Sequence, residues 1–351
     1  MPSRVLSLAK ITKIKTEQEL EERLSRPSDA DVAALAALEG DLIILGAGGK
    51  MGPSLAQLAR RAADRAKVAT KIIAVARFTN DNLRSQLVTQ GVEIVTSDLL
   101  EPGALAKLPD VANVIYMAAR KFGTTGSEHL SWAINTYLPG LVAERYRNSR
   151  IVAFSTGNVY PLRPVQEGGA VESSPCDAQG EYAQSALGRE RMFEYGSHRW
   201  GTPVTILRLN YAVELRYGVL VDIGRAVFER RPIDLRMGSV NVIWQGDANS
   251  ACLRSLAHCQ SPPLLLNLTG HEILSVRQIA HEFGEHFGVE PSFAFEEAPT
   301  ALLSDAAKAH RLLGRPEVST GEMIEWIADW IQQGGVMLGK PTHFQTRDGK
   351  F

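Results

Sequence analysis

Residues 42–52, which read LIILGAGGKMG, constrain the fold of this chain more than any other segment. Four apolar residues typical of a buried parallel strand lead directly into glycines, and a helical pattern over 53–66 follows. This order suits the pyrophosphate of a dinucleotide, because glycines let the backbone approach the phosphates and a helix N-terminus offers unpaired N–H groups. A tight turn without a ligand is the alternative. The residues expected to contact the dinucleotide are Gly46, Gly48, Gly49, Lys50, Met51 and Gly52.

Apolar and helical segments alternate from residue 42 to about residue 215. Further strands are expected at 72–76, 92–95, 114–118, 151–154 and 204–207, and further helices at 80–90, 130–147 and 181–199. Near-continuous apolar strands separated by helices indicate a parallel sheet covered on both faces. The pattern therefore predicts an α/β fold: a doubly wound parallel sheet (Rossmann fold) with a smaller C-terminal substrate lobe.

Four segments organise the chain. They are a helical arm at 1–40, a dinucleotide-binding Rossmann domain at 41–215, a substrate-binding lobe at 216–334 and a tail at 335–351. In the arm, Thr16 and Ser28 are expected N-caps of two short helices that pack on the body or on a second subunit. The lobe is expected to contain short strands at 232–235 and 264–268 and helices near 247–258, 275–287, 302–313 and 320–333. Disorder and a crossing to a partner subunit both remain open for the tail.

Composition excludes several classes of protein. Lys and Arg number 38 against 39 Asp and Glu, so nucleic acid is not an expected partner. No apolar run reaches the roughly 18 residues of a membrane helix, no signal peptide is evident, and three unpaired cysteines suit a reducing interior. We expect a cytoplasmic protein. His281 and His286 lie five residues apart rather than the four of a zinc helix, so no metal is expected.

The residues after the second and third strands bear on cofactor choice. The second strand ends in Ala76-Arg77, where an acid would bond the ribose 2′-hydroxyl of NAD and an arginine accommodates the 2′-phosphate of NADP. We expect NADP to be preferred and NAD to be possible, although Arg77 could be a solvated surface residue. Asp98 and Leu99 follow the third strand, where they would lie near the adenine; an Asx-turn is the alternative for Asp98.

Several short segments, in a fixed order, resemble those of a known family. They are Gly46-x-x-Gly49-x-x-Gly52, MAARK at 117–121, WAIN at 132–135, FSTGNVY at 154–160, ESSP at 172–175, GEY at 180–182, LNLTGHEILS at 266–275, SDAAK at 304–308, LGRP at 313–316, and Trp326. Over residues 41 to about 334 the chain resembles the extended short-chain dehydrogenase/reductases, the NAD(P)-dependent sugar epimerase/dehydratase group. The resemblance implies a homodimer built on helices that follow the fourth and fifth strands.

The resemblance also implies roles for individual residues. Tyr182 matches the catalytic tyrosine, which passes a proton while hydride moves to or from the nicotinamide, and Thr156 matches the residue that hydrogen-bonds the substrate oxygen. The other cofactor contacts that it implies are Ala118, Ala119, Lys121, Asn135 and Tyr182 itself, and the implied substrate contacts are Ser155, Asn158 and Tyr211. A hydroxyl at the end of the fifth strand and a phenol on the next helix can converge on one oxygen.

One departure from the family pattern is large. The family reads Tyr-x-x-x-Lys, whereas this chain has Ala186 where the lysine belongs. The ammonium matters because a free phenol has a pKa of about 10, and a nearby cation favours its ionised form. Arg189 lies two turns from Tyr182, which is too far, so the candidate replacements are Lys121, His129 and Arg216. Alternatively, the protein binds its cofactor without turnover, as a redox sensor or scaffold; a lyase that holds its cofactor tightly is a third option.

The substrate lobe departs from the family as well. Arg208 is present, but residues 240–247, VNVIWQGD, lack the arginine that usually contacts a nucleotide diphosphate. Since a diphosphate favours bidentate guanidinium contacts, a free sugar or sugar acid is the better expectation than a nucleotide-sugar. The predicted function is NAD(P)-dependent oxidation, reduction or epimerisation of a small carbohydrate-like molecule.

Overall fold

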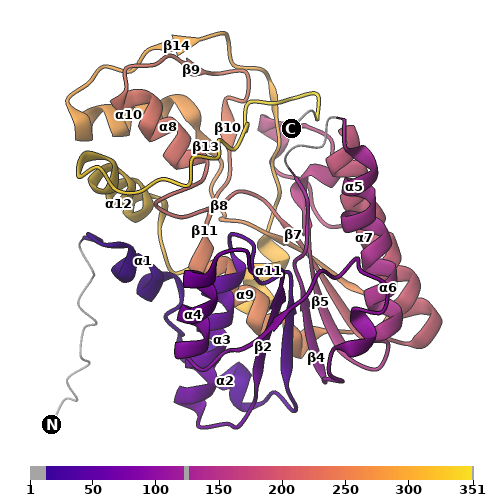
Figure 1. Cartoon of the computed structure of the whole chain (residues 1–351). Helices are drawn as coiled ribbons and strands as arrows, with labels where there is room; N and C mark the ends of the chain where they lie inside the picture. Colours follow the sequence, from indigo (N-terminus) through magenta and orange to yellow (C-terminus); the bar gives the residue numbers. More distant parts are fainter. Residues whose placement is uncertain (1–12, 122–125, 350–351) are drawn as a thin grey trace, which may run out of the picture.

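The computed structural model describes residues 13–121 and 126–349, and its centre is a seven-stranded sheet (Figure 1). The strand order is β12-β7-β5-β4-β1-β2-β3, and every neighbouring pair is parallel. The strands are β1 Leu42–Leu45, β2 Ile72–Ala76, β3 Glu93–Thr96, β4 Asn113–Tyr116, β5 Arg150–Thr156, β7 Val204–Leu209 and β12 Leu264–Leu268. The expected doubly wound α/β fold is confirmed.

Helices cover both faces of this sheet, as strand alternation requires. On β1, Leu42 and Ile44 face one core, whereas Ile43 and Leu45 face the other. The first face is covered by α3 Gly52–Ala66, α4 Asp81–Thr89, α9 Gln245–Ser255 and α11 Ala307–Leu313. The second is covered by α5 Glu128–Trp132, a π-helical turn at Ala133–Tyr137, α6 Leu138–Arg145 and α7 Gly180–Trp200.

The topology places a crevice between β1 and β4. The chain passes from β1 outward through β2 and β3, then returns to β4 and continues outward on the other side. At such a switch point the connections leave in opposite directions, so the carboxyl ends of the two strands border an open crevice. Residues 46–52 follow β1 and residues 117–121 follow β4, so both segments lie at this crevice.

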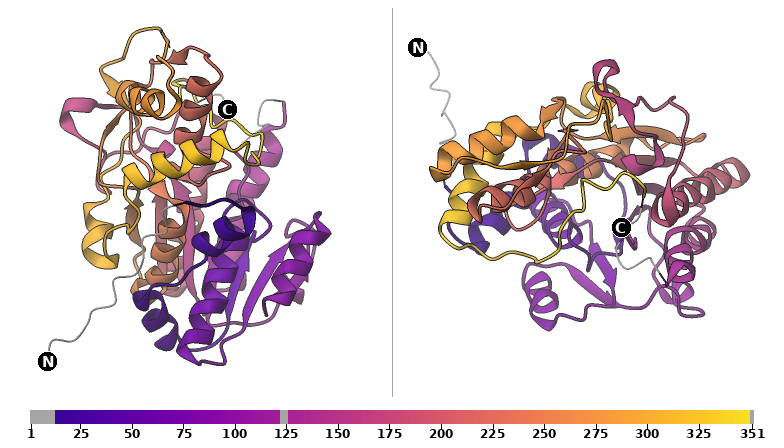
Figure 2. Two further views of the ribbon diagram at one scale, coloured as in Figure 1. Left: turned by 90° about the vertical axis from the view of Figure 1, so that its left-hand side faces the viewer. Right: turned by 90° about the horizontal axis from the view of Figure 1, so that it is seen from above.

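A second lobe lies beyond the carboxyl ends of the strands (Figures 1 and 2). Its helices are α1 Glu17–Leu24, α8 Val219–Phe228, α10 Val276–Phe287 and α12 Thr320–Gln332, which share one hydrophobic core. Its short strands form two pairs, β9 Ile233–Asp234 with β14 Phe293–Ala294 and β10 Ser239–Val240 with β13 Leu274–Ser275. Two further pairs lie between the lobe and the sheet: β6 Arg163–Pro164 with β15 Thr300–Ala301, and β8 Ala212–Val213 with β11 Ile243–Trp244.

The N-terminal arm packs on the body of the same chain. Thr16 and Ser28 cap α1 and α2 (Asp29–Ala36), each within a capping box, so both expected caps are confirmed. Helix α1 contributes Leu20 and Leu24 to the lobe core, whereas α2 packs against α3 and α9. The first part of the expected arm, residues 1–12, lies outside the described residues.

Two expectations for the lobe are wrong. Residues 264–268 are not a short strand of the lobe but β12, which pairs in parallel with β7 at the edge of the central sheet. Residues 302–306 are not helical, because α11 begins only at Ala307. An apolar run indicates that a segment is buried, but it does not indicate which strands or helices the segment packs against. The run at 264–268 therefore could not be assigned to the central sheet from the sequence.

The tail packs on the lobe of its own chain over residues 335–349, rather than being disordered. Arg347 donates from Nη1 to the backbone oxygens of Thr300 and Arg236, at 2.7 and 2.9 Å. Residues 350–351 lie outside the described residues. Within the described ranges, no helix combines the length and apolar character needed to cross a bilayer.

Candidate active site

The glycine-rich loop after β1 is tightly packed on its inner side and open on its outer side. Gly46 has φ +91°, and a Cβ there would lie 2.5 Å from the backbone nitrogen of Ala118. A Cβ on Gly52 would overlap the backbone oxygen of Ala47. Gly48 and Gly49 are exposed, and a Cβ on Gly49 would meet nothing closer than 3.4 Å. A Cβ on Gly48 would lie 2.9 Å from the Cβ of Ala76, so Gly46, Gly48 and Gly52 are required by close packing, whereas Gly49 leaves the backbone accessible to a ligand.

The start of α3 is suited to a pyrophosphate. Met51 is its N-cap residue and supplies no side-chain acceptor, so no side chain caps the first-turn N–H groups. Such groups bind phosphate oxygens at the positive end of a helix dipole. Lys50 adjoins this turn. The residues present thus fit the pyrophosphate of a nicotinamide dinucleotide.

Lys50 is an amine at the crevice whose charge is easily changed by its surroundings. Its side chain is accessible to solvent but surrounded by protein, and desolvation lowers the pKa of its amine to about 7 despite the opposing effect of Glu214. Its Nζ lies 3.2 Å from the centroid of the Tyr217 ring, a cation–π contact. An amine with this pKa gains charge when an anion binds next to it.

Arg77 and Asp98 lie together at the ends of β2 and β3. The Nη1 atom of Arg77 is 4.0 Å from Oδ2 of Asp98, and the Arg77 side chain is 72% exposed. Asp98 accepts the backbone N–H of Leu100 at 3.1 Å, which is the Asx-turn alternative. The Leu99 side chain is buried in the core between the sheet and α6, so only its backbone is placed to contact an adenine, and that contact stays a prediction.

Thr156 and Asn158 form one polar unit at the end of β5. The Thr156 hydroxyl donates to Oδ1 of Asn158 at 2.9 Å and accepts the backbone N–H of Asn158 at 3.2 Å. Tyr182 lies in the first turn of α7 and is half-buried. The end of β5 and the start of α7 thus present a hydroxyl and a phenol near the crevice, and their catalytic roles stay predictions.

Ser155 and Asn135 do not face the crevice, contrary to expectation. The Ser155 hydroxyl donates to Oε1 of buried Glu190, because successive residues of β5 point to opposite faces. The Asn135 side chain is fully buried: its amide donates to Arg120 O at 2.9 Å, and its Oδ1 accepts the backbone N–H of Arg120 at 2.9 Å. Asn135 therefore fixes the backbone that precedes Lys121 instead of presenting atoms to a cofactor.

Lys121 is the candidate replacement that lies beside Tyr182. Its Nζ is 5.8 Å from the centroid of the Tyr182 ring. Desolvation lowers the pKa of its amine to about 8, opposed by the negative charge of Asp222. Ala186 is fully buried and leaves no functional group at the usual position of the lysine. Ala118 and Ala119 precede Lys121 and are partly exposed, as is expected of residues that border the crevice.

Arg189 and Arg216 are occupied elsewhere. Arg189 donates to Phe154 O and to Oδ1 of Asn135, at 2.7 and 2.8 Å, which confirms that it is not available to Tyr182. Arg216 forms ion pairs with Glu214, Glu21 and Glu17. His129 lies exposed on α5.

Sequence reasoning missed Tyr217 and Asp222, which come from α8 and the turn before it. Asp222 and Tyr217 line one cavity, and the negative charge of Asp222 raises the pKa values of Lys50 and Lys121. Burial raises the pKa of Asp222, and hydrogen bonds from Thr342 oppose that rise. Neighbouring Tyr211 has φ +47°, and burial raises the pKa of its phenol. The available signal in the sequence was Gly218, since a glycine ahead of a helical pattern is typical of a turn, and the structure gives it a positive φ.

The nucleotide-binding arginine of the family has no counterpart at its expected place. Val240 is fully buried. Arg208 is buried too, and it pairs with Glu190 at 2.7 Å and donates to Tyr160 Oη at 2.7 Å. Neither residue can contact a diphosphate in this arrangement.

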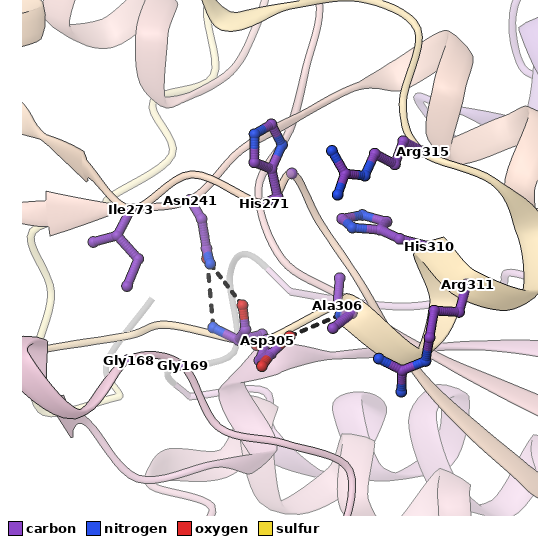
Figure 3. Close-up of a pocket in the computed structure, with 13 residues that line it drawn as sticks. Gly168, Gly169, Asn241, His271, Ile273, Asp305, Ala306, His310, Arg311 and Arg315 are labelled. Atoms are coloured by element: carbon purple, nitrogen blue, oxygen red, sulfur yellow. Dashed lines mark hydrogen bonds between the residues drawn. The ribbon is translucent and has the colours of Figure 1, made fainter.

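A separate cavity of about 400 Å³ lies between the loop at 168–169 and the start of α11 (Figure 3). Figure 3 shows His310 next to Arg315 on one side of the cavity, and the His310 Nε2 lies 2.9 Å from Thr269 O. This cavity contains none of the predicted site residues. In the described part of the chain, no group of three His, Cys, Asp or Glu side chains is placed to hold a metal ion.

Comparison with known proteins agrees with this fold. The model of the NAD dependent epimerase/dehydratase family matches residues 42–213. The UDP-glucuronic acid 4-epimerase from Bacillus cereus, solved with UDP-glucuronic acid and NAD, has a TM-score of 0.70 at 18% identity. The UDP-glucose 4-epimerase from Thermotoga maritima, solved with UDP-glucose, has a TM-score of 0.67 at 14% identity. Both likenesses cover 84% of this chain and 99% of the other, and they establish a shared fold. No curated protein matches the sequence.

Proposed function

We propose that the chain is a nicotinamide-dependent enzyme that oxidises, reduces or epimerises a small carbohydrate-like substrate, because the model of the NAD dependent epimerase/dehydratase family matches residues 42–213. The observation that carries this proposal is the position of the Lys121 amine, 5.8 Å from the Tyr182 ring. It supplies, from the segment after β4, the cation that Ala186 cannot supply from α7. A cation beside a phenol favours transfer of its proton.

The chain's own residues divide the chemistry between them. Residues 46–52 and the first turn of α3 would hold the pyrophosphate, and the bound nicotinamide would supply hydride transfer. Thr156 would orient the substrate oxygen by a hydrogen bond, and Tyr182 would accept or donate the proton of that oxygen. Lys121 would stabilise the ionised phenol. Lys50 would neutralise charge at the phosphates.

We propose a free sugar or sugar acid as the substrate rather than a nucleotide-sugar. The two solved epimerases were captured with UDP-sugars. In this chain, however, Val240 and Arg208 leave the expected diphosphate position without a free guanidinium. Turnover of simple sugars or sugar acids, with none of UDP-sugars, is the expected result of a substrate panel followed by absorbance of the reduced nicotinamide.

The preferred cofactor is proposed to be NADP, on account of Arg77 at the end of β2. Replacing Arg77 by alanine is expected to weaken NADP binding about tenfold and to leave NAD binding unchanged, because a charged hydrogen bond contributes about 1.5–3 kcal/mol and Arg77 is mostly exposed. Calorimetry with both cofactors measures this. Arg147→Ala removes the same charge beyond the end of α6 and should change neither affinity. Equal losses for NAD and NADP would exclude the proposed role of Arg77.

A cofactor-binding protein without turnover is the second candidate, and Ala186 is the observation that favours it. The same panel separates the two candidates. Tight dinucleotide binding with no turnover on any sugar, sugar acid or UDP-sugar would favour the binding protein. Failure to bind NAD and NADP would exclude both. We also propose a cytoplasmic location, since Cys176, Cys252 and Cys259 are all unpaired.

We propose a homodimer across the face of α6 and α7. Tyr137, just before α6, is 62% exposed and Tyr195 on α7 is 56% exposed, which is unusual for large apolar rings. Light scattering is expected to give twice the chain mass of 38.3 kDa. The double change Tyr137→Glu and Tyr195→Glu should give monomers, whereas Phe228→Glu on α8 should not. A monomeric wild-type protein would contradict the proposal.

A further inference from the structure

The segment 336–349, here called the C-terminal strap, is fixed to the second lobe. Its first residue accepts a hydrogen bond from Trp330, whose Nε1 lies 3.0 Å from Val336 O. Farther along, the Phe344 side chain is buried in the lobe core. Figure 1 shows the strap, in yellow, running from α12 past β13 and β10 toward the upper end of α5. The strap also lies outside residues 42–213, which carry the family match.

The end of the strap meets the first turn of α7 through two glycines. Gly349 has φ +72° and Gly180, the first residue of α7, has φ +79°. A Cβ on Gly349 would overlap the backbone oxygen of Gln179, and a Cβ on Gly180 would overlap the backbone oxygen of Gly349. This backbone contact therefore requires glycine on both sides. It lies two residues from Tyr182.

The middle of the strap forms hydrogen bonds with the carboxylate of Asp222. The Thr342 backbone N–H and hydroxyl both donate to Oδ2 of Asp222, at 2.8 and 2.6 Å. These hydrogen bonds favour the ionised form of Asp222, whose charge acts on Lys50 and Lys121. The strap therefore influences the same two amines that the proposed mechanism uses.

A cavity lies between the strap and α8, next to this carboxylate. It has a volume of about 360 Å³, and its lining includes Tyr217, Asp222, Lys340 and His343. Because the Tyr217 ring also contacts Lys50, the cavity adjoins the glycine-rich loop. Its size is at the low end of the range of about 300–1,000 Å³ for small-molecule pockets, which suits a compact polar ligand.

We propose that the C-terminal strap is a wall of the active site, which closes the crevice beside Tyr182 and positions the Asp222 carboxylate toward Lys121. Thr342 is then a positioning residue, because it acts through Asp222. This inference rests on the proposed function for its catalytic meaning. The docking of the strap on α7 can be tested independently of that function.

The glycine contact offers a matched pair of variants. Gly349→Ala introduces both a strained positive φ and an overlap with Gln179, whereas Gly339→Ala, also in the strap, introduces the strain at φ +64° with nothing within 4 Å. Hydrogen exchange of residues 180–187 in the cofactor-free protein is expected to rise in Gly349→Ala only. Stopped-flow fluorescence should show NADPH leaving Gly349→Ala at least about threefold faster than wild type. Gly339→Ala should match wild type in both measurements.

A second variant tests the link through Asp222 by a pH profile. Thr342→Val removes one of the two donors that hold Oδ2 of Asp222 in place, so the carboxylate should move away from Lys121 and raise the pKa of that amine less. The titratable or charged groups that interact electrostatically with Asp222 are Arg225 on its own helix, His343 on the strap, and Tyr217, Lys50 and Lys121 around the crevice. The pH at which NADPH affinity falls is expected to move downward relative to wild type. A structural role alone would change affinity without moving this midpoint.

The outcomes separate the two proposals. If the wild-type protein binds neither dinucleotide, the proposed function fails, and the exchange measurement still tests the strap. If Gly349→Ala and Gly339→Ala behave alike in exchange, the strap does not close on α7 and the inference is overturned. If the dinucleotide binds and its release and pH midpoint are unchanged in Gly349→Ala and Thr342→Val, the strap is not part of the active site.

Discussion

Replacing Lys121 by methionine is expected to lower kcat about 100-fold or more, the usual contribution of assisted proton transfer. Its amine lies 5.8 Å from the Tyr182 ring centroid, Ala186 supplies no cation one turn from Tyr182, and Arg189 is bound to Phe154 O and Asn135. Methionine keeps the length and apolar body of the side chain, so the loss would report the charge. The measurement is the rate of nicotinamide absorbance change on the sugar or sugar acid that the panel identifies.

The pKa of Lys121 also predicts the direction in which the rate changes with pH. The pKa of Lys121 is lowered to about 8, chiefly by desolvation, so its amine is charged below pH 8 and neutral above it. The wild-type rate should therefore decline as pH rises through about 8, and Lys121→Met should lack this decline. Tyr182→Phe should lose turnover at every pH. The exposed Lys107 provides a control, since Lys107→Met should keep the wild-type rate and profile. A fully active Lys121→Met would exclude the proposed role of this lysine.

Replacing Arg208 by methionine is expected to lower the free energy of unfolding by about 3–5 kcal/mol, as happens when one partner of a buried ion pair is removed. The side chains of Arg208 and Glu190 are 4% and 2% exposed, and their closest atoms are 2.7 Å apart. The variant would leave the Glu190 carboxylate buried and opposed by no cation. The Ser155 hydroxyl, which donates to Glu190, cannot balance a full charge. Urea unfolding followed by circular dichroism measures the change.

Two comparisons identify the buried charge as the cause. The double variant Arg208→Met with Glu190→Met removes both charges and should recover much of the lost stability. Arg225→Met breaks an exposed pair with Glu229, at 39% and 37% exposure, and should cost less than about 1 kcal/mol. If Arg208→Met were no more destabilising than Arg225→Met, the buried network would not hold β5, β7 and α7 together as described.

Local pattern was sufficient to predict the central strands and the helices between them. The run LIILG and the apolar segments at 72–76 and 204–207 are each confirmed as strands, because burial on both faces leaves a continuous apolar signature. The same signature could not show that 264–268 joins β7, since the partner of a strand is a long-range property. The family motif likewise marked the sites of Ser155 and Asn135, but a hydroxyl or amide can bond a buried neighbour as readily as a ligand.

The crevice was less predictable, because its groups come from distant parts of the chain. Tyr217 and Asp222 belong to no motif, and only the packing of the second lobe brings them to Lys50 and Lys121. Of the candidate replacements for the missing lysine, Lys121 lies beside Tyr182, whereas Arg216 is held in ion pairs with Glu21 and Glu214. The spacing of residues along α7 could not show that Lys121, which follows β4, lies beside Tyr182.

The position of β12 has a consequence for how the chain is made. Its strand closes the sheet beside β7, yet the segment that forms α8 and α9 is synthesised between the two strands. Until residue 268 leaves the ribosome, the nascent sheet ends in the apolar edge of β7 with its backbone groups unpaired. Sheet completion must therefore wait for much of the lobe to emerge, which makes this edge a point where the newly made chain needs protection from aggregation.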